Sequence, residues 1–106
     1  MRKYHSLTVN GEEYRLRLTA GAIVSIEKKL GKSLFSALES IQDNMVETMT
    51  TILWGAMQPL NPGFTPEKAA ELFDDYIDDG HSIEGLMQEI NALFEASGFF
   101  RKGQAK

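Results

Sequence analysis

The pattern of hydrophobic and polar positions predicts a β-hairpin over residues 3–18. Apolar and polar side chains alternate on both sides of Asn10-Gly11, and Asn-Gly favours a type I′ turn between two antiparallel strands. The apolar face of this hairpin needs other elements to cover it, because an isolated hairpin is marginally stable in water. The predicted pairs across the turn are Val9–Glu12, Leu7–Tyr14 and His5–Leu16.

After the hairpin, the apolar residues repeat with the period of an α-helix. Thr19, Ser33, Asp43-Asn44, Thr65 and Ser82 are predicted N-caps, and Gly31, Gly80 and Gly98 are predicted helix ends. Glu47, three residues after Asn44, extends that cap to a capping-box variant. We predict a mainly helical α+β fold with an N-terminal hairpin and four or five short helices. It forms a single domain over residues 1–106, comprising the hairpin (3–18), a helical body (20–98) and a basic C-terminal tail (99–106).

Composition narrows the range of functions. The chain of 106 residues contains no cysteine, which excludes disulfides, a thiol nucleophile and thiolate metal sites. The N-terminus is polar, so no signal peptide is predicted. The apolar run from Ile52 to Met57 is too short to span a membrane. We therefore expect a cytoplasmic protein without a membrane partner.

Charge is unevenly distributed along the chain. Residues 1–35 carry a formal charge of +4, residues 36–100 carry −11 and residues 101–106 carry +3, which together give the net charge of −4. The acidic body would repel nucleic-acid phosphates, so nucleic acid is not an expected partner. This separation of positive and negative charge along the chain favours a basic protein partner or weak head-to-tail self-association.

Three sequence patterns resemble chemical sites but fail on their spacing. Gly31-Lys32-Ser33 resembles the end of a phosphate-binding loop, but the first glycine of that pattern is replaced by Ile26 and a helix is predicted there. A calcium loop starting at Asp75 would have Ile77 and Leu86 at ligand positions. His5 and His81 have no histidine or cysteine at metal-ligand spacing. We predict no catalytic residues, cofactor or metal.

Several residues remain as candidates for binding a partner. A helix is predicted to open at Thr65-Pro66 and to end at Gly80, and its acidic cluster forms either a solvated face or a surface for a basic partner. The cluster comprises Glu71, Asp74, Asp75, Asp78 and Asp79. Trp54 either packs under the loop that holds Pro59 and Pro62 or anchors an interface. The methionines fill the core or line an adaptable groove, and the two terminal aromatics fold back or dock onto a partner. The predicted partner-binding residues are Trp54, Met57, Glu71, Asp75, Asp78, Asp79, Phe99 and Phe100.

The order of the predicted hairpin and helices along the chain resembles that of a known protein family. The segment Arg17-Leu18-Thr19 is followed by Gly21 and then by Ile26-Glu27 and Leu30-Gly31. This pattern, with the hairpin before it and short acidic helices after it, resembles the tail assembly chaperones of long-tailed, siphovirus-type bacteriophages and prophages. The resemblance implies a non-catalytic protein of the host bacterial cytoplasm that is absent from the finished virion. It implies that the chain binds the tape measure protein, keeps it soluble and helps to recruit tail tube subunits.

Two other function classes stay open. One is a small acidic regulatory or inhibitor protein that binds a host enzyme through its acidic helix. The other is a structural protein of tail completion or head–tail joining. A slippery heptamer near the codons for Arg101 to Lys106, with an overlapping reading frame, would favour the chaperone, because that family often makes a longer frameshifted product.

Overall fold

The computed structural model describes residues 3–99, and within them a two-stranded hairpin is followed by five α-helices and one 3-10 helix. The predicted α+β, mainly helical fold is therefore confirmed. The elements are β1 (His5–Val9), β2 (Glu12–Leu16), α1 (Ala20–Leu30), α2 (Leu34–Glu39), η1 (Ile41–Asp43), α3 (Met45–Met57), α4 (Pro66–Asp78) and α5 (Ile83–Ser97).

The hairpin has the predicted turn and register. Asn10 and Gly11 both have positive φ, at 53° and 79°, as a type I′ turn requires. Leu7, Val9 and Leu16 are each at most 2% exposed, so the predicted apolar face is buried. The strand pairs are His5–Leu16, Ser6–Arg15, Leu7–Tyr14, Thr8–Glu13 and Val9–Glu12.

Most of the predicted helix caps are confirmed by side-chain hydrogen bonds. The cap side chains of Thr19, Ser33, Thr65 and Ser82 accept from the backbone N–H of Ala22, Ser36, Lys68 and Gly85. Asn44 differs: it precedes α3, but its side chain makes no capping hydrogen bond. The capping box predicted with Glu47 is therefore wrong. The chain enters α3 from the 3-10 helix η1, and Asn44 donates its own backbone N–H to Ile41.

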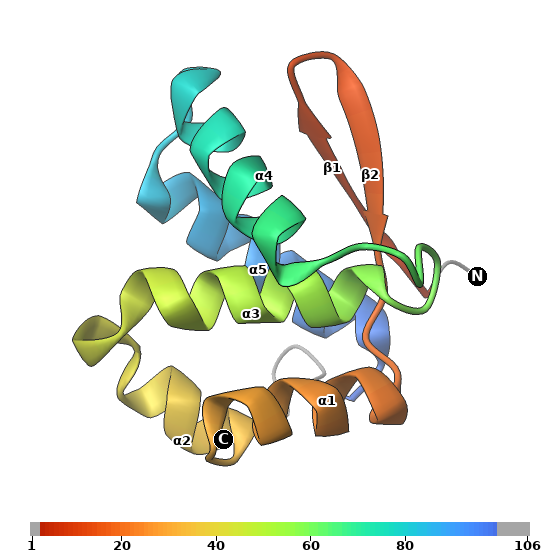
Figure 1. The fold of residues 1–106 in the computed structure, drawn as a ribbon, viewed down its shortest axis with the longest axis vertical. Coiled ribbons are helices and arrows are strands. Elements are labelled where there is room, and N and C mark those ends of the chain that lie inside the picture. Colours follow the sequence, from red (N-terminus) through yellow and green to blue (C-terminus); the bar gives the residue numbers. More distant parts are fainter. Residues whose placement is uncertain (1–2, 100–106) are drawn as a thin grey trace.

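Helix α3 is the centre of the molecule. It crosses the middle of the fold, with α1 and α2 along one side, α4 on the other and α5 behind, while the hairpin stands near its C-terminal end (Figure 1). The backbone N–H of Arg17 donates to the carbonyl of Ala56 at 2.8 Å, which joins the end of the hairpin to α3. Ile52 and Ala56 are completely buried.

The contact between α1 and α3 is unusually close. A Cβ atom on Gly55 would lie 2.3 Å from Cγ1 of Ile26, far inside the van der Waals contact distance. Ile26 is itself fully buried. Glycine is therefore required at position 55 for the two helices to pack as they do.

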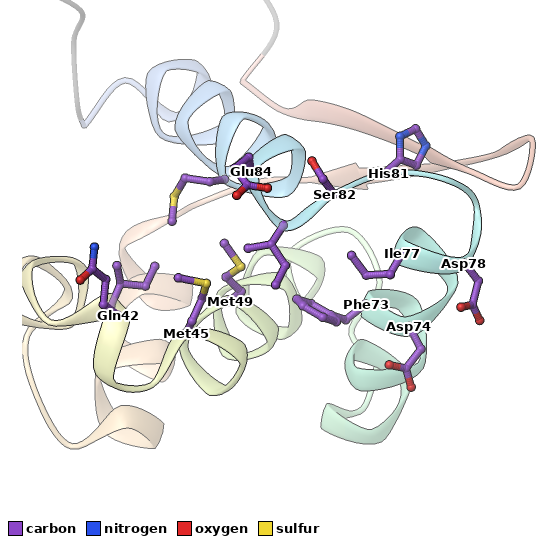
Figure 2. Close-up of a pocket in the computed structure, with 13 residues that line it drawn as sticks. Gln42, Met45, Met49, Phe73, Asp74, Ile77, Asp78, His81, Ser82 and Glu84 are labelled. Atoms are coloured by element: carbon purple, nitrogen blue, oxygen red, sulfur yellow. The ribbon is translucent and has the colours of Figure 1, made fainter.

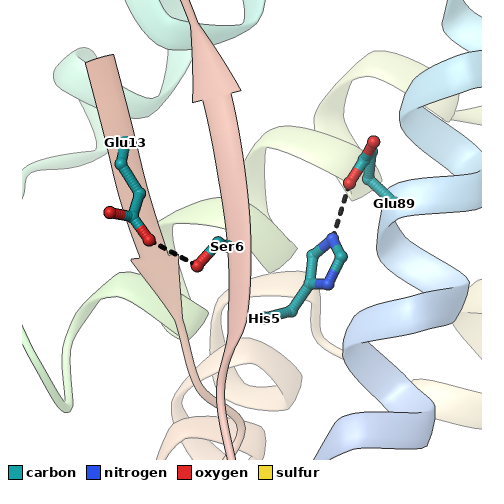
Figure 3. Close-up of polar contacts among 4 residues, drawn as sticks. All are labelled: His5, Ser6, Glu13 and Glu89. Carbon is teal, nitrogen blue, oxygen red and sulfur yellow. Dashed lines mark hydrogen bonds and ion pairs between the residues drawn. The ribbon is translucent and has the colours of Figure 1, made fainter.

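Polar contacts hold the hairpin against the helices. His5 Nε2 and Glu89 Oε1 lie 2.5 Å apart, which links β1 to α5 (Figure 3). On the opposite face of β1, the Ser6 hydroxyl donates to Glu13 at 2.6 Å. Near the hairpin tip, the Asn10 backbone N–H donates to the Asp79 carboxylate at 3.0 Å. The hairpin is thus fixed to both α4 and α5.

Candidate partner-binding groove

An apolar groove lies between α3, α4 and the start of α5. It encloses about 860 Å³ and is closed at one end by Ile41 and Gln42 of η1. Three helices supply its floor, each through a pair of apolar side chains one helical turn apart. These pairs are Met45 and Met49 of α3, Phe73 and Ile77 of α4, and Ile83 and Met87 of α5.

The floor is apolar but still open to solvent. Met49 and Phe73 are buried, whereas the other four members of the pairs are half-buried. Phe73 and Ile77 extend from α4 toward the methionines of α3 (Figure 2). Methionine is unbranched and flexible, so a floor with three of them can adapt to the shape of a bound side chain.

The rim of the groove is acidic. Asp74 and Asp78 of α4 and Glu84 of α5 line it and are exposed. Within residues 3–99 none of these three carboxylates forms an ion pair, and none of the described lining residues is Lys or Arg. Asp78 is the last residue of α4, where its negative charge opposes the helix macrodipole. The rim therefore has a local excess of negative charge.

Two other polar side chains of the groove, His81 and Ser82, already have partners inside the protein. The His81 ring stacks on Tyr76, with the ring centroids 4.4 Å apart, and its Nε2 lies 3.3 Å from Asp79 Oδ2. The Ser82 hydroxyl accepts from the backbone N–H of Gly85 at 3.0 Å. Burial raises the pKa of Tyr76 above its ordinary value of 10, and the charge of Glu89 adds to the rise. None of these groups forms a nucleophile–base pair directed into the groove.

The described residues contain neither a cluster of metal ligands nor a membrane-spanning helix. Across residues 3–99, no group of three His, Cys, Asp or Glu side chains is placed to hold a metal ion. No helix in the same range is long and apolar enough to cross a bilayer.

Comparison with protein families identifies one match. The model of a family of unknown function, DUF6096, matches residues 3–106. The chain belongs to this family. Comparison with curated proteins and with solved structures gives no match. The family match includes the hairpin and every helix that lines the groove.

In this DUF6096 member, the predicted acidic binding residues do not form one site. Asp78 lines the groove, whereas Glu71 and Asp75 line a smaller hollow beside Tyr14. Asp79 accepts the hydrogen bond from Asn10 and pairs with His81, so it has a structural role. The negative charge of Glu12 contributes to a raised pKa at Tyr14, although burial is the larger cause.

The predicted apolar binding residues also lie apart. Met57 is only 2% exposed and belongs to the core, and it lines a hollow beside Tyr14 and Leu60 instead of the groove. Trp54 is half-buried, with Lys29 Nζ 5.7 Å from the centre of its ring, and it does not line the groove. Phe99 is 53% exposed. Phe100 lies outside the described residues.

Sequence reasoning missed most of the residues that form the groove. Asp74 and Glu84 were not among the predicted binding residues, and Met45, Met49 and Met87 had two open interpretations, core or adaptable groove. One signal was available: Asp74 and Asp78 follow Phe73 and Ile77 directly. This adjacency places an acidic row next to an apolar row along α4.

Proposed function

We propose that the chain is a non-catalytic tail assembly chaperone of a long-tailed bacteriophage or prophage. In this role it binds the tape measure protein in the host cytoplasm, keeps that protein soluble and helps to recruit tail tube subunits. The single observation that carries the proposal is the open groove, whose apolar floor contains Met45, Met49 and Met87. A chaperone for a long helical protein needs such a surface to cover apolar side chains before assembly.

Three further observations support the proposal. The sequence from Arg17 to Gly31 has the pattern that resembles the tail assembly chaperones. The structure contains the hairpin and the series of short helices on which this resemblance partly rests. The acidic surface around the groove also supports solubility, because net negative charge opposes association between like molecules.

Co-expression with the adjacent gene product tests the proposal. We expect the neighbouring tape measure protein to accumulate in the soluble fraction and to co-purify with this chain. The chain with Met45→Asp places a charge in the groove and should lose both effects. A tape measure protein that stays equally insoluble with and without this chain, and that does not co-purify, contradicts the proposal.

Val46→Asp is the matched control. Val46 is 52% exposed and does not line the groove, and it follows Met45 directly in the first turn of α3. An aspartate is electrostatically favourable in the first turn of a helix, so both variants should fold. We expect Val46→Asp to keep the tape measure protein soluble, as the unmodified chain does.

A further inference from the structure

We infer that the groove binds an amphipathic helix from another protein, with basic side chains along its flank. The apolar side chains of that helix would cover the methionine floor, and its Lys or Arg side chains would lie beside Asp74, Asp78 and Glu84. The inference deepens the proposed function and rests on it for the identity of the partner. The chemistry of the bound segment follows from the groove itself.

The form of the bound segment follows from what lines the groove. Every apolar lining residue belongs to a helix or to the turn before one, so the groove has no strand edge to pair with an extended peptide. The first turn of α5 is already capped by Ser82. A segment buried here must therefore satisfy its own backbone hydrogen bonds, as a helix does. Side chains at i, i+3, i+4 and i+7 of a helix form the apolar stripe that such a groove accepts.

The charge of the bound segment follows from the rim. Asp74 and Asp78 lie one turn apart beside the apolar row of α4, and Glu84 faces the groove from the first turn of α5. These carboxylates have no cationic partner within residues 3–99. Lys or Arg on the flank of a bound helix would pair with them and offset the unfavourable charge at the end of α4.

The groove does not have the features of a small-molecule site. Such sites combine an apolar lining with a few polar groups directed at the ligand. Here the inward polar groups are engaged elsewhere: His81 stacks on Tyr76 and pairs with Asp79, and Ser82 caps α5. The remaining polar groups are exposed carboxylates and Gln42 at the rim.

A second copy of the chain is a weaker fit than a separate helix. The described basic helix is α1, with Lys28 and Lys29 in its last turn. Ile26 of α1 is already packed against α3, and Val24 is the one large apolar side chain of α1 that is exposed. One exposed valine cannot cover a floor supplied by three helices.

Binding of synthetic helical peptides tests the inference directly. The first peptide has leucine at i, i+3, i+4 and i+7 positions, lysine on both flanks and a length of about 18 residues, enough to form a helix. The second carries glutamate in place of lysine, and the third has the composition of the first in scrambled order. By fluorescence anisotropy, we expect the lysine helix to bind at least about tenfold more tightly than either control. The advantage over the glutamate helix should shrink at about 0.5 M NaCl, since salt screens exposed charges.

A pair of double variants locates the binding site on α4. Asp74→Asn with Asp78→Asn removes two charges from the groove rim, whereas Glu71→Gln with Asp75→Asn removes two charges from the side near Tyr14. All four residues are exposed, and circular dichroism would verify that both variants fold. We expect the first pair to weaken binding of the lysine helix about tenfold and the second to change it less than about threefold.

Several results would overturn the inference. These are equal binding of the lysine and glutamate helices, equal binding of the scrambled peptide, or equal effects of the two double variants. Peptide-free dimerisation that Asp74→Asn with Asp78→Asn abolishes would assign the groove to a second copy instead. The two proposals fail separately. If the Met45→Asp variant still keeps the tape measure protein soluble, the groove is rejected as the site but the chaperone function stands. If the chain binds the lysine helix tightly but does not keep the tape measure protein soluble, the chaperone function is rejected but the inference about the groove stands.

Discussion

The two ends of α3 have opposite kinds of surroundings. At the C-terminal end, Gly55 lets α1 approach so closely that no Cβ atom fits between the helices, and the carbonyl of Ala56 bonds to the hairpin end. At the N-terminal end, Met45 is half-buried and lines a groove that α4 and α5 leave open. One helix thus contributes both to the packed core and to the open surface.

The difference lies in the side chains that each end presents. Gly55 and Ala56 are small, and small residues allow neighbouring elements to approach closely, which maximises dispersion contacts. Met45 is long and flexible, and its neighbours across the groove leave it half-buried, whereas Met49, one turn further along, is buried. From this contrast we expect the C-terminal end of α3 to contribute more to stability than the open N-terminal end.

The largest test of this contrast compares a truncation in the buried middle of α3 with one at its open N-terminal end. Ile52→Ala leaves a cavity at a completely buried position, so we expect it to lower the free energy of unfolding by about 2–5 kcal/mol. Met45→Ala acts at a half-buried position on the open side and should cost less than about 1 kcal/mol. Urea denaturation monitored by circular dichroism measures both values. Equal losses at the two positions would show that the groove floor is as important for stability as the core.

A second test adds a methyl group instead of removing one. Gly55→Ala forces its Cβ atom against Ile26, and overpacking of this kind costs about 1–3 kcal/mol. Alanine recovers about 1 kcal/mol of that through its higher helix propensity, so we expect a net loss of up to about 2 kcal/mol. The melting temperature should fall accordingly.

Gly21→Ala is the control for this substitution. Gly21 also lies in a helix, but a Cβ atom there would meet nothing closer than the Thr19 Oγ1 atom at 3.9 Å. We expect this variant to be neutral or stabilised by up to about 1 kcal/mol. If Gly55→Ala were also stabilising, the close approach of α1 and α3 would not be a constraint on the fold.

Local features of the fold were predictable from the sequence because local chemistry determines them. Asn10-Gly11 defines the turn, and once the turn is fixed the alternation of apolar residues allows a single register with a buried face. Thr65 followed by Pro66 predicts the start of α4 in the same way, since the cap and the proline both favour a first helical turn there. These predictions need only neighbouring residues.

The groove was not predictable by the same reasoning. Its floor joins pairs of residues from α3, α4 and α5, and their arrangement depends on how three helices pack around the hairpin. Periodicity shows that Met45 and Met57 both lie on apolar stripes, but it does not show that one faces a groove and the other the core. Likewise, Asp74 and Asp75 are adjacent in sequence, but Asp74 lines the groove and Asp75 lines the hollow beside Tyr14.

The smallest test concerns the helix starts at the edge of the groove. Ser82→Ala removes the hydroxyl that caps α5, so we expect a loss of about 1 kcal/mol in the free energy of unfolding. Asn44→Ala is the counterpart at the start of α3, where the side chain makes no capping hydrogen bond, and it should cost less than about half as much. Denaturant unfolding of both variants gives the comparison. A larger loss of unfolding free energy for Asn44→Ala would mean that the N-terminal end of α3 depends on its own cap. The open end of this helix would then contribute more to stability than its exposed surroundings indicate.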